Sequence, residues 1–264
     1  ATMSALPGPL AKRFEDSVMA TNFHSFAWAL LRRYWRSLLL PVNVDELSMV
    51  DDSSAVNELS SRGGRLIWDE KKVVDNFLRS MRNGQDDDLR CRVRSFNRII
   101  KDRFAPNGLL PYSGMISLAI ELLADFSKLR SYLSTAFPVV LVDEAQDTNA
   151  LCYIFLKGLL SDESGICMFG DPIQRVYGFI GAMEGLKTKA ATDLCLSQLE
   201  LEHNHRFSGG SIVGELGAAI RSNMKGVIAG GTPRLPIFVG AAQQDEATAI
   251  VSKVAALARG GGGR

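Results

Sequence analysis

The sequence has no apolar run as long as a membrane span, which needs roughly 18 residues. No basic segment followed by an apolar one opens the chain. Charge of one sign is not in excess either, because the net charge is +1. Overall charge therefore gives no argument for nucleic-acid binding, which only local patches could support. We expect a protein with no membrane partner, located in the cytoplasm or, in a eukaryote, the nucleus.

Cysteine is also sparse, with four residues in 264 and no Cys-x-x-Cys pair. This spacing argues against a disulfide framework and against a zinc site, and it suits a reducing compartment. Hydrophobic residues make up 46% and charged residues 22% of the chain. Those values are typical of an ordinary globular protein with a real core.

Helical periodicity dominates the first half of the sequence. It predicts helices over residues 9–17, 25–39, 68–81, 87–104 and 115–133, a short strand at 18–22, and a polar loop at 41–66. From residue 139 the pattern changes. Apolar runs predict strands at 139–142, 166–169, 194–201 and 236–240, with helices at 150–160, 209–222 and 245–258. Strands that alternate with helices indicate an α/β fold with a parallel sheet, in which the helical block 41–115 is an insertion.

The stretch VVLVDEAQD (139–147) is an apolar strand that ends in a cluster of acids. We expect the strand to be buried on both faces of the sheet. Ligands bind beyond the carboxyl ends of such strands. There Asp143 could hold Mg²⁺ through water, and Glu144 could deprotonate an attacking water. The alternative is a surface turn that is acidic without a function.

Three further stretches accompany it in order: NFHSFA (22–27) before it, and GDPIQRVYGFIGA (170–182) and LELEHNHRF (199–207) after it. Together the four resemble the motifs of UvrD/Rep-like superfamily 1 DNA helicases. The resemblance runs from about Leu10 to Ala258. It implies two RecA-like motor domains, Mg²⁺ and ATP as cofactors, and movement on single-stranded DNA.

The resemblance also implies catalytic roles. Asp143 matches the Mg²⁺-binding acid and Glu144 the catalytic base. Gln174 matches a glutamine that senses the terminal phosphate. Arg206 matches an arginine that neutralises charge in the transition state.

Other nucleotide contacts follow from the same motifs. Gln146 and Asp147 complete the acidic motif. His205 stands where the family usually has a tyrosine on the adenine.

Phe23, His24, Tyr177 and Phe179 match positions that line the single-stranded DNA track, where rings stack on bases. For a single phenylalanine, plain core packing is an alternative, and His24 could be a structural histidine.

A basic stripe lies on one face of the predicted helix 87–104 and consists of Arg90, Arg94, Arg98 and Lys101. It falls in the block that resembles the family's helical insertion, which contacts duplex or flanking DNA. Arg94 and Arg98 are therefore candidate DNA contacts. A solvated helix face is the alternative.

The sequence departs from the family in two respects. ATP binding there needs G-x-x-x-x-G-K-[ST], whose amides and lysine cradle the phosphates, and these 264 residues do not contain it. We expect the chain to begin just downstream of that loop. Ile180 also stands where the family usually has arginine.

The resulting expectation is an internal portion of an ATP-dependent DNA helicase. Residues 1–40 and 116–200 would form most of the first motor domain, 41–115 its helical insertion, and 201–264 the start of the second. Its partners would be single-stranded DNA, single-strand/duplex junctions, and repair or recombination proteins. One alternative is a non-hydrolysing DNA-binding or scaffold module. Another is a different DNA-stimulated nucleotidase or a nuclease-fused motor.

Overall fold

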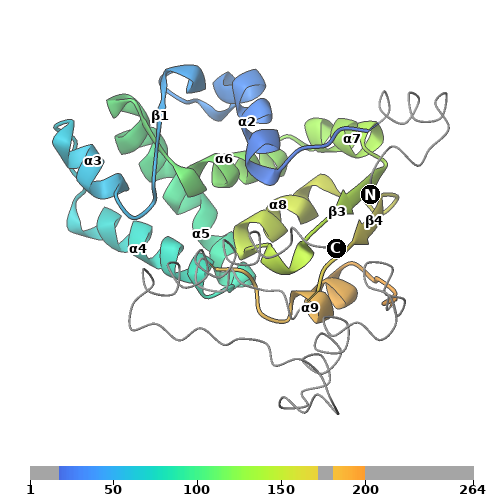
Figure 1. Cartoon of the computed structure of the whole chain (residues 1–264). Helices are drawn as coiled ribbons and strands as arrows, with labels where there is room; N and C mark the ends of the chain where they lie inside the picture. Colours follow the sequence, from blue (N-terminus) through green and yellow to red (C-terminus); the bar gives the residue numbers. More distant parts are fainter. Residues whose placement is uncertain (1–17, 172–180, 200–264) are drawn as a thin grey trace, which may run out of the picture. The chain divides into compact units, whose positions relative to one another are not determined.

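The computed structural model describes residues 18–171 and 181–199. The chain divides into two compact units, Ala1–Gln198 and Leu199–Arg264. The helices and strands of the described residues all belong to the first unit (Figure 1). The helices predicted at 9–17, 209–222 and 245–258, and the strand at 236–240, lie outside the described residues.

Helix α2 spans Phe23–Tyr34 and begins at an N-cap. The side-chain oxygen of Asn22 accepts the Ser25 amide at 2.8 Å, which satisfies one of the free donors of the first turn. A 3₁₀ turn at Trp35–Leu38 continues the helix before Pro41. The predicted helix is confirmed, but the strand predicted at 18–22 is wrong, because those residues form no ladder and lead directly into the cap.

Residues 41–66 hold more structure than the predicted loop. They contain a 3₁₀ turn at Val44–Glu46, strand β1 at Ser48–Val50 and helix α3 at Ala55–Ser61. Strand β1 pairs in parallel with β2, Leu109–Pro111. Elements this short do not establish a periodicity, and the partner strand is distant in sequence, so the local pattern indicated only a polar segment.

Two longer helices follow, α4 at Trp68–Arg82 and α5 at Asp86–Ile99. They pack together through the stacked rings of Phe77 and Phe96, whose centroids are 3.9 Å apart. Both predicted helices are confirmed. The second continues past Ile99 as a π-helical turn, Ile100–Phe104, and a 3₁₀ turn, Ala105–Asn107.

The single helix predicted at 115–133 is two helices, α6 at Tyr112–Asp125 and α7 at Ser127–Ala136, separated at Phe126. Helix α6 is the centre of the core and packs against α2, α5 and α8. Gly114 permits its close approach to neighbours, since a Cβ there would lie 2.8 Å from Ile100 Cδ1.

Strands β3, Val139–Val142, and β4, Gly165–Met168, form a parallel pair connected by α8, Ala150–Leu159. The α/β connection and the parallel pairing are confirmed. Burial on both faces is wrong for the described residues, because Val139 and Leu141 are 62% and 60% exposed. Only the alternate side chains of β3 turn toward the core, as period-two geometry requires of a sheet packed on one face.

The end of the first unit is helical. Helix α9 spans Leu186–Asp193. The described residues 194–199 form no strand, so the strand predicted at 194–201 is wrong over that part. Among the described helices, none combines the length and the apolar character needed to cross a membrane.

A charged cluster, the lysine–aspartate cluster, ties α9 to α5 and α8. Asp86, only 5% exposed, lies 3.1 Å from Lys157 Nζ and 3.2 Å from Lys189 Nζ. Asp193 lies 3.1 Å and 3.5 Å from the same two nitrogens and accepts the Tyr153 hydroxyl at 3.0 Å. Two acids are thus matched by two lysines across three helices.

All four cysteines are free thiols. Cys152 is buried in α8, and desolvation raises its pKa to about 12. Cys91, Cys167 and Cys195 are exposed.

Candidate active site

The acidic motif begins where β3 ends, and the backbone of β4 fixes its path. The Phe169 amide donates to Val142 O at 2.8 Å, and the Ala145 amide donates to Phe169 O at 2.8 Å. The parallel ladder therefore continues beyond both strands and holds the start of the motif against residues 169–171. The acids lie at the carboxyl end of the sheet, as the sequence predicts.

Glu144 has an unusual backbone conformation, with φ 47° and ψ 41° in the left-handed region. A side chain with a Cβ adopts this region at a cost, and such residues cluster at functional sites. The Glu144 amide donates to Asp143 Oδ1 at 3.0 Å. Both carboxylates are exposed, so the turn presents two neighbouring acids to solvent.

Gln146 connects the motif to the segment after β4. Its Nε2 donates to Glu144 Oε2 at 2.7 Å, and its Oε1 accepts the Asp171 amide at 3.0 Å. The residue is only 8% exposed, so both ends of the amide are held in place. Gly170 makes this contact possible, because a Cβ there would lie 2.6 Å from Gln146 Oε1.

Asp147 has a buried carboxylate oxygen, Oδ1, with no hydrogen-bond partner among the described residues. A buried oxygen of this kind is costly unless something donates to it. The motif then ends at Asn149, whose side chain accepts the Cys152 amide at 2.9 Å and caps α8. Just before it, Thr148 O accepts the Met183 amide at 3.0 Å, which fixes the segment that follows residue 181.

The donor set suits Mg²⁺ better than a metal that needs a full protein cage. Asp143, Glu144 and Asp147 form no ion pair with a described residue. Within residues 18–171 and 181–199, no group of three His, Cys, Asp or Glu side chains could hold a metal. One or two carboxylates with water and phosphate oxygens are the usual Mg²⁺ environment, and the exposed Asp143 with the partnerless Asp147 oxygen fits it.

The predicted DNA residues at the start of α2 lie partly in the core. Phe23 is half-buried and packs against the core. His24 packs on Tyr112 with ring centroids 4.6 Å apart, and burial lowers its pKa. Tyr112 begins α6 and is 49% exposed, and the sequence patterns did not single it out. The sequence feature that could have pointed to Tyr112 is an aromatic residue directly after Pro111, at the start of a helix.

The basic stripe on α5 and on the π-helical turn after it is largely paired. Arg94 lies 2.5 Å from Asp125 and Arg98 lies 3.5 Å from Asp102, and both arginine side chains remain mostly exposed. Lys101 is paired with Glu121 at 2.6 Å. These contacts fit a solvated helix face, and they leave Arg94 and Arg98 accessible.

Five of the predicted site residues lie outside the described residues. They are Gln174, Tyr177, Phe179, His205 and Arg206. The part of the site that the structure describes is therefore the acidic part, residues 143–147 with Gly170 and Asp171.

Comparison with known proteins identifies the family. Residues 6–194 match the UvrD/REP helicase N-terminal domain. The chain is 24% identical over 215 residues to the ATP-dependent DNA helicase Rep of Escherichia coli, an alignment that covers 76% of this chain and 31% of Rep. It is 26% identical over 198 residues to DNA helicase II of Haemophilus influenzae, covering 70% of this chain and 27% of that protein.

A third relative, ATP-dependent DNA helicase UvrD1 of Mycobacterium bovis, is 27% identical over 187 residues, covering 66% of this chain and 24% of its own length. The chain thus spans about a third or less of these relatives. The matched domain implies a RecA-like fold for the parallel strands and the helices around them. Because the family model covers well over half of the chain and includes the acidic motif, the chain belongs to the UvrD/Rep helicase family.

Proposed function

We propose that this chain is part of an ATP-dependent DNA translocase in which residues 143–147 form the hydrolytic half of the nucleotide site. The observation that carries the proposal is the held position of Glu144. A left-handed backbone and the Gln146 amide fix an exposed carboxylate at the carboxyl end of the parallel strands. A carboxylate that is exposed, oriented and free of any described cation is suited to accept a proton.

The chemistry follows from these groups. Glu144 would orient a water and take its proton as that water attacks the terminal phosphate of ATP. Gln146 would keep the Glu144 carboxylate turned toward the end of β4, since its amide is fixed by Asp171 on the other side. Asp143 and Asp147 would hold Mg²⁺, which neutralises phosphate charge when it is bound.

The roles of the remaining residues rest on the family resemblance. Gln174 would sense the terminal phosphate, Arg206 would supply transition-state charge, and His205 would lie on the adenine. Phe23, His24, Tyr177 and Phe179 would line the single-stranded DNA track, with 3′-to-5′ movement as the family implies. Arg94 and Arg98 would contact flanking DNA.

The domain assignment is part of the same proposal. Residues 1–40 and 116–200 would belong to the first motor domain, 41–115 to its helical insertion, and 201–264 to the second motor domain. The segment that follows residue 181 is held against Thr148, beside the acidic motif. That contact supports placing the segment after residue 181 in the same domain as the acidic motif.

A second candidate is a DNA-binding or scaffold module that does not hydrolyse ATP. It is favoured by one observation, that these 264 residues contain no phosphate loop. Against it, a module without hydrolysis has no physical need for a strained glutamate held by a buried amide.

The two candidates are separated by ATP turnover and nucleotide binding. We expect the purified 264-residue chain to hydrolyse ATP negligibly, because a base without a phosphate cradle has no positioned substrate. A longer chain of the same protein that includes a phosphate loop should show DNA-stimulated turnover. Robust turnover by the 264-residue chain would contradict the first expectation. No turnover by the longer chain would favour the scaffold module.

DNA binding is tested separately by fluorescence anisotropy with a labelled single-stranded oligonucleotide. We expect weak, salt-sensitive binding that drops when Tyr177 and Phe179 are both replaced by alanine. The loss should be about 1–3 kcal/mol per stacked base. Trp68→Ala, an exposed aromatic on α4, is the matched control and should bind as the parent does. Equal binding by the double variant would show that its rings are not the contacts.

A further inference from the structure

A groove with an aliphatic floor lies between α5, α6 and α8. Its volume is about 440 Å³, within the range of ligand pockets. Ile120, Leu123 and Ala124 of α6 and Ile154 and Gly158 of α8 line it. Gly158 adds no side chain to this floor, where a Cβ would be in van der Waals contact with Leu123 Cδ1 at 3.4 Å. The floor can therefore accept an apolar side chain from outside.

The walls of this groove are basic. Arg90, Arg94, Arg130 and Lys157 line it, against the single acid Glu121, so the lining charge is four minus one, or +3. The whole chain carries only +1. Acids just outside the lining, Asp86, Asp125 and Asp193, pair with two of these cations, so the positive charge open to a ligand is smaller than +3.

Two of these cations are available to a partner. Arg94 is paired with Asp125, and Lys157 belongs to the lysine–aspartate cluster. Arg90 and Arg130 form no ion pair with a described residue, and both are exposed. They stand on different helices, α5 and α7, and both border the aliphatic floor. An acidic ligand between them would gain two charge-assisted contacts.

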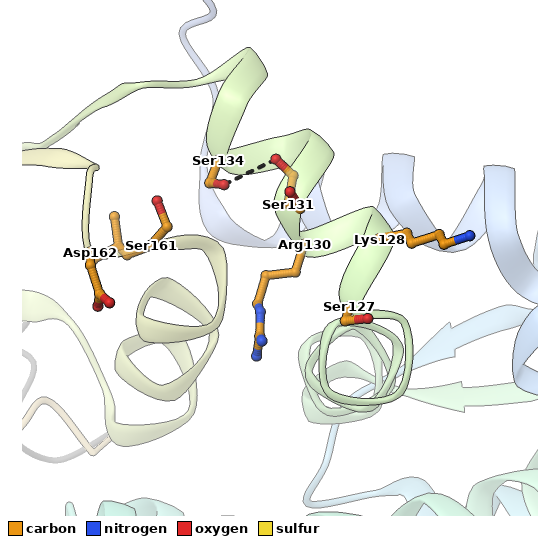
Figure 2. Close-up of a pocket in the computed structure, with 8 residues that line it drawn as sticks. Ser127, Lys128, Arg130, Ser131, Ser134, Ser161 and Asp162 are labelled. Carbon is orange, nitrogen blue, oxygen red and sulfur yellow. Dashed lines mark hydrogen bonds between the residues drawn. The ribbon is translucent and has the colours of Figure 1, made fainter.

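A second hollow adjoins the groove through Arg130, which lines both. Figure 2 shows Arg130 leaving α7 into the space between Asp162 and Ser127, while Lys128 points away. Four serines, Ser127, Ser131, Ser134 and Ser161, line this hollow. Hydroxyl groups both donate and accept hydrogen bonds, so they suit the polar backbone of a peptide.

The chemistry of the lining selects among partners. A single-stranded nucleic acid is held by aromatic rings that stack on its bases, and neither hollow has an aromatic residue in its lining. A small anion has no use for an aliphatic floor. An acidic peptide with a large apolar side chain matches both parts of the surface: the acids meet Arg90 and Arg130, and the apolar side chain fills the floor beside Ala124.

We propose that the groove between α5, α6 and α8 is a docking site for an acidic peptide segment of a partner protein, anchored by one large apolar side chain. The groove differs from the acidic motif in charge, because its lining is mostly basic. Of the two arginines proposed to contact flanking DNA, Arg94 lines the groove and Arg98 does not, so the oligonucleotide probe in the test below separates the two uses of the surface.

The test uses the full 264-residue chain and a panel of fluorescein-labelled peptides of about twelve residues. Each peptide has four acidic residues around one central Leu, Ile, Met, Phe or Trp. A second panel replaces the central residue with Ser, and a single-stranded oligonucleotide is the third probe. The variants are Arg90→Glu with Arg130→Glu, and Ala124→Asp. Arg65→Glu with Arg79→Glu, two exposed arginines outside the groove, matches the change in net charge.

We expect at least one apolar-centred peptide to bind, and its Ser counterpart to bind at least tenfold more weakly. The Arg90/Arg130 variant should lose at least tenfold in affinity, because charges at an interface rim govern association and its salt dependence. The Arg65/Arg79 variant should bind as the parent does. Ala124→Asp should abolish binding while leaving the circular dichroism spectrum unchanged.

Four results would overturn the proposal. One is the absence of binding by every apolar-centred peptide. Another is equal binding by the Ser-centred panel, which would show that charge alone accounts for the binding. The third is an equal loss of affinity in the Arg65/Arg79 variant. The fourth is an oligonucleotide whose binding depends on Arg90 and Arg130 and excludes the peptides.

Discussion

Two groups of acidic residues in the first unit differ in whether cationic side chains pair with them. In the lysine–aspartate cluster, Asp86 and Asp193 each lie within reach of two lysine nitrogens. At the end of β3, Asp143, Glu144 and Asp147 form no ion pair with a described residue, and one oxygen of Asp147 is buried without a donor. The difference separates acids that are paired within the fold from acids that, under the proposed function, would bind a cation.

The two groups of acids also differ in backbone conformation. Asp86 opens an ordinary helix, whereas Glu144 occupies the left-handed region. A protein can carry such local strain when the surrounding structure over-determines it, and here the β3–β4 ladder and Gln146 do so. Variants that change either the lysine–aspartate cluster or the acidic motif, one at a time, should have effects of different size.

The largest effect is expected on turnover, in a longer chain that carries a phosphate loop. Glu144→Gln should lower single-turnover hydrolysis by about 10²–10⁴-fold, as expected for loss of a general base, with little change in ATP affinity. Arg206→Ala should lower it by about 10³–10⁵-fold if Arg206 acts as an arginine finger. Asp143→Ala should instead weaken Mg²⁺-dependent ATP binding.

Affinity and single-turnover rates, each measured with and without DNA, would separate these roles. Near-normal hydrolysis in Glu144→Gln would remove the base assignment. Retained hydrolysis in Arg206→Ala would remove the arginine-finger assignment.

The next effect is on stability and concerns the matched acids. Asp86→Ala should lower the free energy of unfolding by about 1–3 kcal/mol, since the two lysines lose their buried partner and keep only Asp193. Urea titration followed by circular dichroism would measure it. Asp86→Ala combined with Lys189→Met, which keeps the Lys157–Asp193 pair, should be more stable than Asp86→Ala alone. If the combined variant is weaker still, the cluster does not work through charge.

A smaller effect, a gain in stability, is expected when the strained backbone at Glu144 is relieved. Glu144→Gly should be more stable than Glu144→Ala by about 1 kcal/mol, because only the glycine adopts the left-handed backbone without cost. Both variants lose the Gln146 contact, so their difference isolates the backbone. Thermal melts of the two proteins would show it. Equal melting temperatures would mean that the turn relaxes when the side chain is removed.

The smallest effect is on pH dependence. Burial opposes ionisation of Asp193, but hydrogen bonds from Lys157 and Tyr153 and the lysine charges prevail, so the pKa of Asp193 is lowered. A carboxylate whose folded pKa is lowered contributes stability above its ordinary value, about 3.9. That stability is lost as the pH falls through the folded pKa.

Unfolding free energies measured from about pH 5 down to about pH 2.5 should therefore fall less steeply in Asp193→Asn than in the parent. Asp162→Asn, an exposed aspartate outside the cluster, is the control and should follow the parent. Identical slopes in Asp193→Asn and the parent would contradict the assignment.

The sequence predicted the elements whose signal is local. Continuous apolar runs located β3 and β4, and helical spacing located α4 and α8. It failed where tertiary context decides. The pairing of β1 with β2 joins two three-residue strands distant in sequence, and the break at Phe126 interrupts a pattern that is otherwise helical.

The predicted site followed the same division. Asp143 and Glu144 could be placed at the end of a strand because the motif directly follows an apolar run. The link from Glu144 through Gln146 to Asp171 could not, since it depends on which loop lies beside β3 after folding. The exposed face of β3 was missed for a related reason: four consecutive apolar residues do not reveal how many layers cover them.

The four free thiols give this chain a built-in set of chemical probes. At neutral pH a maleimide or an iodoacetamide should leave Cys152 unmodified, because its thiol is buried and stays protonated. Cys91 borders the groove between α5, α6 and α8, Cys167 lies on β4, and Cys195 follows α9. Dyes placed singly at these three positions, with the other exposed thiols changed to serine, would report on three surfaces of one unit without adding any new residue to attach them.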